Sequence, residues 1–213
     1  QNNSWNVPLY IDGAGWAADE TREHAALRLF RALGPNTSAK SLVFRNASLN
    51  EEMNQAFSQA MDLNTQLASL TLRNLSSGDQ PYDIPPSVFR NPYLETLNLS
   101  KTSLNKEACR KLSQMIRESR SLNSLGLDAV HIHREGLVSI LAAIIMSRSL
   151  TTLRLNNLEW GKKDIQRLLA ATSYNRSITK LFLERMQLNS GDAEVLSKFL
   201  QRNKTVTELS LRR

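Results

Sequence analysis

An aliphatic anchor recurs along the chain every 27 or 28 residues, and each anchor is followed two positions later by a second apolar side chain. The anchors are Leu42, Leu70, Leu97, Leu125, Leu153, Leu181 and Leu209, and their partners are Phe44, Leu72, Leu99, Leu127, Leu155, Leu183 and Leu211. Alternation with a period of two residues is typical of a strand that buries one face. The pattern therefore predicts seven short strands, one in each copy of an internal repeat.

Between most of these predicted strands the apolar positions change to a helical spacing of three and four residues. Clear runs are Met53, Phe57, Ala60, Met61; Ala108, Leu112, Met115, Ile116; Leu137, Ile140, Leu141, Ile144; and Val195, Leu196, Phe199, Leu200. The expected helix-start positions are Asn50, Asn105, His133, Gly161 and Asn189, and an Asn side chain there can accept hydrogen bonds from the first helical turn. The second copy instead carries Pro81, Pro85, Pro86 and Pro92. Because proline opposes helix formation, we expect an extended or short-turn segment in that copy.

The LxxLxL strand pattern followed by a helix resembles the leucine-rich repeat, specifically its ribonuclease-inhibitor type, over residues 39–213. The resemblance implies an α/β fold, a right-handed solenoid or horseshoe with a parallel sheet on the concave side and mostly helices on the convex side. Five residues after each anchor, where the family usually has Asn or Cys, this chain has Ala47, Leu75, Thr102, Val130, Leu158 and Met186. We therefore expect no asparagine ladder, and apolar packing with water or main-chain pairing in its place.

The sequence predicts that the chain consists of two segments. Residues 1–38 are predicted to form an N-terminal cap, with VPLYI as an edge strand and AADETREHAALRLFRAL as an amphipathic helix. Residues 39–213 carry the seven strand units, of which the last is incomplete. Only Arg212 and Arg213 follow Leu211, so no further unit covers the apolar edge of the last strand, as stacked repeats require. Since the chain also starts without Met, we expect it to be part of a larger protein.

Composition restricts the class of protein. Of the 213 residues, 41% are hydrophobic, which is enough for a sizeable core and excludes disorder for most of the chain. No run approaches the ~18 consecutive apolar residues of a membrane-spanning helix, so no membrane partner is expected. The single cysteine, Cys109, cannot form an internal disulfide, which fits a reducing compartment. A net charge of +7 favours acidic over basic partners.

One glycine pattern is compatible with cofactor binding. Gly13, Gly15 and Ala18 match the GxGxxA pattern of dinucleotide sites between a possible strand and a helix. Such a site also needs a second strand that ends in a ribose-binding acid, whereas the next strand here ends in Arg45. A plain loop of the cap is the favoured interpretation, and no cofactor is expected.

Metal and catalytic signatures are weak. His131 and His133 could chelate zinc with Cys109 or Asp128, but a structural zinc site needs four converging ligands, and the repeat places both histidines at a turn and a helix start. A GxSxG elbow, a phosphate-binding loop and an HExxH helix are absent from the sequence. We therefore predict no metal site and no catalytic residue in this chain.

The candidate binding surface is the concave face of the predicted sheet, because residues that flank the buried leucines point to the opposite face. The residues selected there as partner-binding are Arg45, Arg73, Asn98, Asp128, Arg154, Phe182, Glu184 and Arg185. Phe182 is the strongest candidate, because aromatic and arginine side chains dominate the energy of protein interfaces. The alternative is that Phe182 packs against Arg154 and only covers the sheet.

These features predict a non-catalytic protein–protein interaction module that binds an acidic or mixed-charge protein partner on its concave face. Nucleic acid is not expected, because the basic residues are spread through the helices without interleaved aromatic side chains. Two enzyme-linked alternatives remain: the substrate-recognition domain of a larger enzyme such as a ubiquitin-ligase-type effector, and a GTPase-activating leucine-rich repeat protein.

The expected location is the cytoplasm. N-x-S/T sequons at Asn46, Asn74 and Asn98 lie on or beside the predicted concave strands, where glycans would obstruct the binding face. The resemblance adds the host cytoplasm after bacterial secretion, because effectors delivered by bacteria are among the proteins that carry such repeats.

Overall fold

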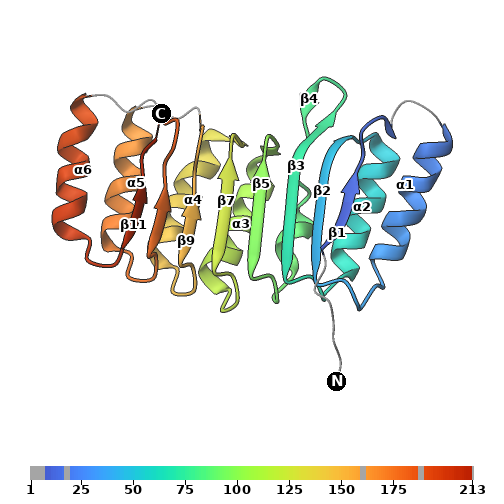
Figure 1. Cartoon of the computed structure of the whole chain (residues 1–213), viewed down its shortest axis with the longest axis horizontal. Helices are drawn as coiled ribbons and strands as arrows, with labels where there is room; N and C mark the ends of the chain where they lie inside the picture. The colour runs from blue at the N-terminus through green and yellow to red at the C-terminus, as the bar shows by residue number, and fades with distance from the viewer. Residues whose placement is uncertain (1–7, 17–19, 159–161, 187–189, 213) are drawn as a thin grey trace.

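Strands and helices alternate through the computed structural model, which describes residues 8–16, 20–158, 162–186 and 190–212. The elements are β1 (Leu9–Asp12), α1 (Glu20–Leu33), β2 (Ser41–Ser48), α2 (Glu51–Leu63), β3 (Ser69–Ser77), β4 (Gln80–Pro81), the 3₁₀ helix η2 (Pro86–Arg90), β5 (Thr96–Ser100), β6 (Ser103–Leu104), α3 (Lys106–Glu118), β7 (Ser124–Asp128), β8 (His131–Ile132), α4 (Arg134–Met146), β9 (Thr152–Arg154), α5 (Lys162–Tyr174), β10 (Lys180–Phe182), α6 (Ser190–Arg202) and β11 (Glu208–Ser210). Figure 1 shows the strands side by side in one layer with the helices on one side of it.

The main sheet is parallel in the order β1-β2-β3-β5-β7-β9-β10-β11, with the short β4 antiparallel to β3. The predicted anchors lie opposite one another in register, from Leu42 on β2 to Leu209 on β11. The anchors from Leu42 to Leu181 are buried between the sheet and the helices, as are their partners from Phe44 to Leu183. The prediction of an α/β fold with a parallel sheet is confirmed, and within the described residues β1 and β11 leave the sheet open at its two edges.

Local sequence signals explain where the helices begin and why one unit has no α-helix. Asn50 and Asn105 cap α2 and α3, since their side chains accept hydrogen bonds from the backbone of Met53 at 2.9 Å and Ala108 at 3.0 Å. His133 stands at the start of α4 but makes no such capping bond. The other two expected helix starts, Gly161 and Asn189, lie outside the described residues. The proline-rich copy forms η2 and the short β4 rather than an α-helix, as predicted.

Apolar packing replaces a polar ladder immediately after each strand, as expected. The six residues five positions after the anchors, from Ala47 to Met186, are all buried. Each follows a residue with positive φ, and the six described are Asn46, Asn74, Lys101, Ala129, Asn157 and Arg185. Three of these are asparagine, which tolerates the left-handed region better than most residues. Main-chain bonds between successive units pair the turns, for example from the Lys101 amide to the Asp128 carbonyl at 3.1 Å.

No asparagine ladder forms at this position after the strands, as expected, but an unpredicted one forms after the helices. Asn175 donates to the carbonyls of Ile144 at 2.7 Å and Ser147 at 3.1 Å, and it accepts from the amides of Ser177 at 2.8 Å and Ile178 at 2.7 Å. Asn64 and Asn203 bond in the same way. These side chains satisfy backbone groups that the turn between helix and strand would otherwise leave buried without partners.

The two ends of the sheet differ in how well they are covered. Near β1, the rings of Trp16, Phe30, Phe44 and Phe57 pack together with centroids 5.3 to 5.9 Å apart. At the other end Val206, Leu209 and Leu211 are only partly buried. Among the described helices none is long and apolar enough to span a bilayer.

Candidate functional site

The side of the sheet that carries no helices, which we name the open face, is the surface that the sequence predicts as the binding site. It presents the residues that alternate with the buried leucines, for example Asn98 on β5 and Phe182 on β10. Figure 1 shows the strands of this surface running side by side along the whole molecule. The eight predicted residues are spread over neighbouring strands of this surface, from Arg45 on β2 to Phe182 on β10, with Glu184 and Arg185 directly after β10.

Arg154 and Phe182 meet on neighbouring strands. They are register partners on β9 and β10, and the Arg154 guanidinium carbon lies 4.8 Å from the centroid of the Phe182 ring. This is a cation–π contact, which holds both side chains in a defined position. Both residues are half-buried, so they retain surface that a partner can contact. The contact that the sequence offered as an alternative to binding therefore exists, and it leaves both side chains accessible.

Acidic side chains flank this stack and are fixed by a chain of hydrogen bonds. The backbone amide of Asn156 donates to Asp128 Oδ1 at 3.2 Å, and the backbone amide of Glu184 donates to Asn156 Oδ1 at 2.8 Å. Ser210 Oγ then donates to Glu184 Oε1 at 2.6 Å. Sequence analysis missed Asn156 as a positioning residue, although it lies 28 residues after Asp128 and 28 before Glu184. We name Asp128, Arg154, Phe182 and Glu184 the β9–β10 cluster.

The environment of Asp128 in the cluster shifts the pKa of its carboxyl group. Burial raises the pKa of the Asp128 carboxyl, although the Asn156 backbone hydrogen bond and the Arg154 charge act in the opposite direction. The cluster thus presents one cation, one aromatic ring and two carboxyl groups in fixed positions, which suits a partner of mixed charge.

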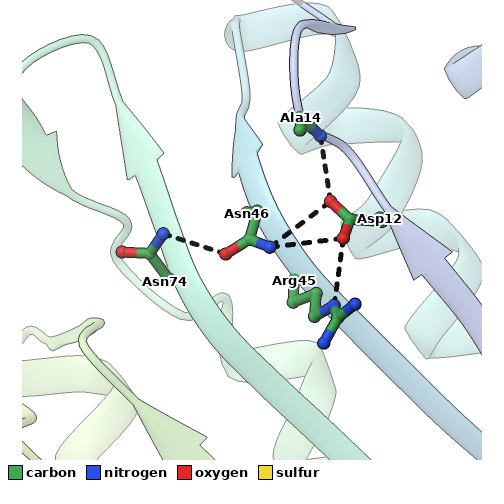
Figure 2. A network of polar contacts seen from close by, with 5 residues as sticks. All are labelled: Asp12, Ala14, Arg45, Asn46 and Asn74. Carbon is green, nitrogen blue, oxygen red and sulfur yellow. Dashed lines mark hydrogen bonds and ion pairs between the residues drawn. The ribbon is translucent and has the colours of Figure 1, made fainter.

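A second group of polar residues lies at the other end of the open face, beside β1 (Figure 2). Asp12 accepts from Arg45 Nε at 3.1 Å and from the Asn46 amide group at 3.3 Å, and Asn46 accepts from Asn74 at 3.0 Å. The Ala14 backbone amide also donates to Asp12, and this bond is the main reason why the pKa of the Asp12 carboxyl is lowered. Arg45 is therefore engaged in an ion pair with the cap.

The remaining predicted residues are placed separately. Arg73 is exposed and lies opposite Arg45 in the register of β2 and β3. Asn98 on β5 extends across Gly126 on β7, since a Cβ added to Gly126 would lie 2.6 Å from Asn98 Oδ1. Arg185 follows the end of β10 at a positive φ of 57° and is exposed. The structure thus brings together four of the eight predicted residues.

The glycine pattern of the cap has a packing explanation. A Cβ on Gly13 would lie 2.4 Å from the Cβ of Ala47, so only glycine allows this close approach of the cap to β2. Gly15 has a positive φ of 78°, as glycine in a turn permits. Ala18, the third residue of the pattern, lies outside the described residues.

The residues considered for zinc do not converge. Among the described residues there is no group of three His, Cys, Asp or Glu side chains that could hold a metal ion. His131 and His133 are exposed, whereas Cys109 is buried and donates to the Leu104 carbonyl. Burial raises the pKa of the Cys109 thiol to about 11, so this side chain is a neutral packing group at physiological pH.

No family model matches the chain, and no curated protein matches it either. Among solved structures it resembles actin-binding site 2 of leiomodin-1, with a TM-score of 0.49 and 19% identity over 87% of this chain and 90% of that chain. It also resembles the tropomodulin C-terminal domain of Caenorhabditis elegans, with a TM-score of 0.42 and 14% identity over 84% of this chain and 92% of that chain. At these scores the likenesses identify no partner for this protein.

The assignment to leucine-rich repeats of the ribonuclease-inhibitor type is wrong. It has no matching family model, and the two solved structures described above are leiomodin and tropomodulin domains. The physical reason is that a regular strand-and-helix period is set by burial of leucines in the sheet, which does not require the family's other positions. In this chain five apolar residues and the buried Thr102 fill the six Asn or Cys positions, and the second unit has no α-helix.

Proposed function

We propose that the chain is a non-catalytic module that binds a protein partner of acidic or mixed charge on its open face, through the β9–β10 cluster. The observation that supports this proposal is the Arg154–Phe182 stack, an aromatic and a cationic side chain that are held together at 4.8 Å and remain half-exposed. Arginine and aromatic residues of this kind are enriched at interface hot spots.

The strands and acidic side chains of the open face are held in place before a partner binds, which favours affinity for that partner. The strands that carry Arg154 and Phe182 are paired on both sides, to β7 and to β11. The Asp128–Asn156–Glu184–Ser210 bonds also fix the acidic side chains before a partner arrives. Binding therefore orders few groups, which reduces the entropic cost of association.

Affinity capture with three versions of the chain tests the proposal. The baits are the wild type, the double variant Phe182→Ala/Arg154→Glu, and Arg28→Glu, which makes the same charge change at an exposed position of α1. We expect a protein that is captured by the wild type and by Arg28→Glu and is lost from the double variant, with circular dichroism showing that all three are folded. A partner that the folded double variant retains would remove the cluster from the binding site.

We also propose a cytoplasmic location for this module. Asn46 and Asn74 lie in N-x-S/T sequons beside the open face, where Asn74 donates to Asn46 and Asn46 donates to Asp12. A glycan on either side chain would break this network and cover the adjacent strands, which supports a compartment without N-glycosylation.

A further inference from the structure

The outer surface of α4 is apolar where the equivalent surfaces of α3 and α6 are polar. Because the units repeat every 28 residues, each position of α4 has a counterpart on α3 and on α6. Val138, Ala142, Ile145 and Met146 take the places of Arg110, Gln114, Arg117 and Glu118 on α3, and of Glu194, Lys198, Gln201 and Arg202 on α6. The exposed fractions of Val138, Ile145 and Met146 are 57%, 41% and 64%. The same fold thus accepts polar residues at these positions, so packing does not require the apolar ones.

Three of these α4 side chains, Val138, Ala142 and Ile145, border a groove between α4 and α5. The groove has a volume of about 360 Å³ and is lined by Val138, Leu141, Ala142 and Ile145 of α4 and by Arg167, Ala170, Ala171 and Tyr174 of α5. Arg167 is paired with Asp164 at 3.2 Å, so the groove floor carries no unpaired charge from this residue. Burial of such a surface against an apolar partner is favourable.

A basic pocket adjoins the groove at Tyr174. Tyr174 belongs to both, and the pocket of about 520 Å³ also contains Arg176, Arg202 and Lys204. Arg148, Arg176 and Lys204 are exposed and succeed one another at intervals of 28 residues, each directly after a buried Ser or Asn of the helix-to-strand turn. Within the described part of the chain none of the three is in an ion pair. At the opposite end, by contrast, Glu135 is paired with Lys106 at 2.7 Å.

We propose that the α4–α5 groove binds an amphipathic protein helix whose acidic N-terminal turn lies on the basic pocket. An apolar groove matches a helix face with apolar residues at i, i+3, i+4 and i+7. Acidic residues stabilise the N-terminus of such a helix and complement Arg176 and Lys204. The bound helix runs antiparallel to α4 and α5, because the pocket lies at their C-terminal ends. This surface is on the helix side of the sheet and is independent of the open face.

A synthetic peptide tests the proposal by fluorescence anisotropy. The probe has about 18 residues, three glutamates at its N-terminus and leucines at i, i+3, i+4 and i+7, since α4 spans about 20 Å. Two control peptides carry lysines in place of the glutamates, or the same leucines in a scrambled order. We expect saturable binding of the probe only, weakened by salt because of the charged end.

Substitutions in the groove and in the basic pocket test whether the peptide binds there. Val138→Arg/Ile145→Arg introduces the residues that α3 has at these positions, so the fold should tolerate it. We expect this variant and Arg176→Glu/Lys204→Glu each to lose affinity by about tenfold or more. Ala25→Arg/Ala32→Arg places two arginines at the same spacing on exposed positions of α1 and should bind as the wild type does.

Other results would overturn the proposal. The first is a wild-type chain that does not bind the probe, and the second is equal binding by the groove variants. A dimer in sedimentation experiments that Val138→Arg/Ile145→Arg abolishes would show instead that a second copy occupies the groove. Pelleting with phosphatidylserine vesicles that the same variant abolishes, without peptide binding, would assign the groove to a membrane surface.

Discussion

The asparagine ladder gives the most quantitative prediction, at Asn175. This side chain is 2% exposed and makes hydrogen bonds to two carbonyls and two amides of the turns around it. After Asn175→Ala the Ser147 carbonyl still accepts from Ser177 Oγ at 3.1 Å, and the Ile144 carbonyl still accepts from the Ser147 amide at 3.3 Å. The amides of Ser177 and Ile178 have no other partner among the described residues, and at about 1 to 2 kcal/mol for each of them the free energy of unfolding should fall by roughly 3 kcal/mol.

Ser147 supplies the matched control, because it occupies the same place one unit earlier. Its hydroxyl accepts a single bond, from the Leu150 amide at 3.3 Å, so Ser147→Ala should cost about 1 kcal/mol. Urea unfolding followed by circular dichroism measures both variants. With a slope of about 2 to 3 kcal/mol per M, the midpoints of the two variants should differ by roughly 0.7 to 1 M. Equal midpoints would refute the argument that the ladder satisfies otherwise unpaired backbone groups.

Three further outcomes follow from packing and burial. Gly136→Ala should lower the unfolding free energy by about 2 kcal/mol in urea titrations, because its Cβ would lie 2.3 Å from Cys109 Sγ, and Cys109→Gly should recover part of the loss. Cys109, with its pKa near 11, should not react with a thiol reagent at about pH 8 until the chain unfolds, and rapid labelling of the folded chain would contradict its burial. Since the pKa of Asp128 is raised in the folded state, the stability it contributes is present at low pH and is lost as pH rises through that pKa. Asp128→Asn should therefore gain stability relative to the wild type between about pH 3 and pH 7, and a parallel pH dependence of the two would count against the raised pKa.

The repeat predicted most of the fold because its main determinant, burial of leucine at alternate strand positions, is visible in the sequence. The anchors from Leu42 to Leu209 lie in register, and Asn50 and Asn105 cap their helices as expected. The effect of the prolines in the second unit was also predictable, because proline acts locally through its fixed φ and missing N–H.

The ladder was not predicted, because the prediction considered only the residue after each strand and not the Asn and Ser residues that recur after each helix. Asn36, Asn64, Asn91, Ser119, Ser147, Asn175 and Asn203 follow the same intervals as the anchors, so the signal was present. What the sequence does not show is that the backbone of the turn comes within hydrogen-bonding distance of the next unit, since that depends on how the units stack.

Some contacts of the proposed binding surface were predictable from the sequence. The repeat period placed Arg154 beside Phe182, and the structure confirms that these side chains are in contact. The ion pair of Arg45 with Asp12 was not predictable, because it depends on how the cap lies against β2. The α4–α5 groove also went unnoticed, since helical periodicity alone does not distinguish Val138 and Ile145 from core residues until their exposure is known.

The central claim is that the β9–β10 cluster binds a protein partner, and isothermal titration calorimetry with the captured protein tests it most directly. We expect Phe182→Ala to raise the dissociation constant by about tenfold or more, while Arg28→Glu leaves it unchanged. A folded Phe182→Ala chain that binds with the affinity of the wild type would show that the cluster is not the binding site.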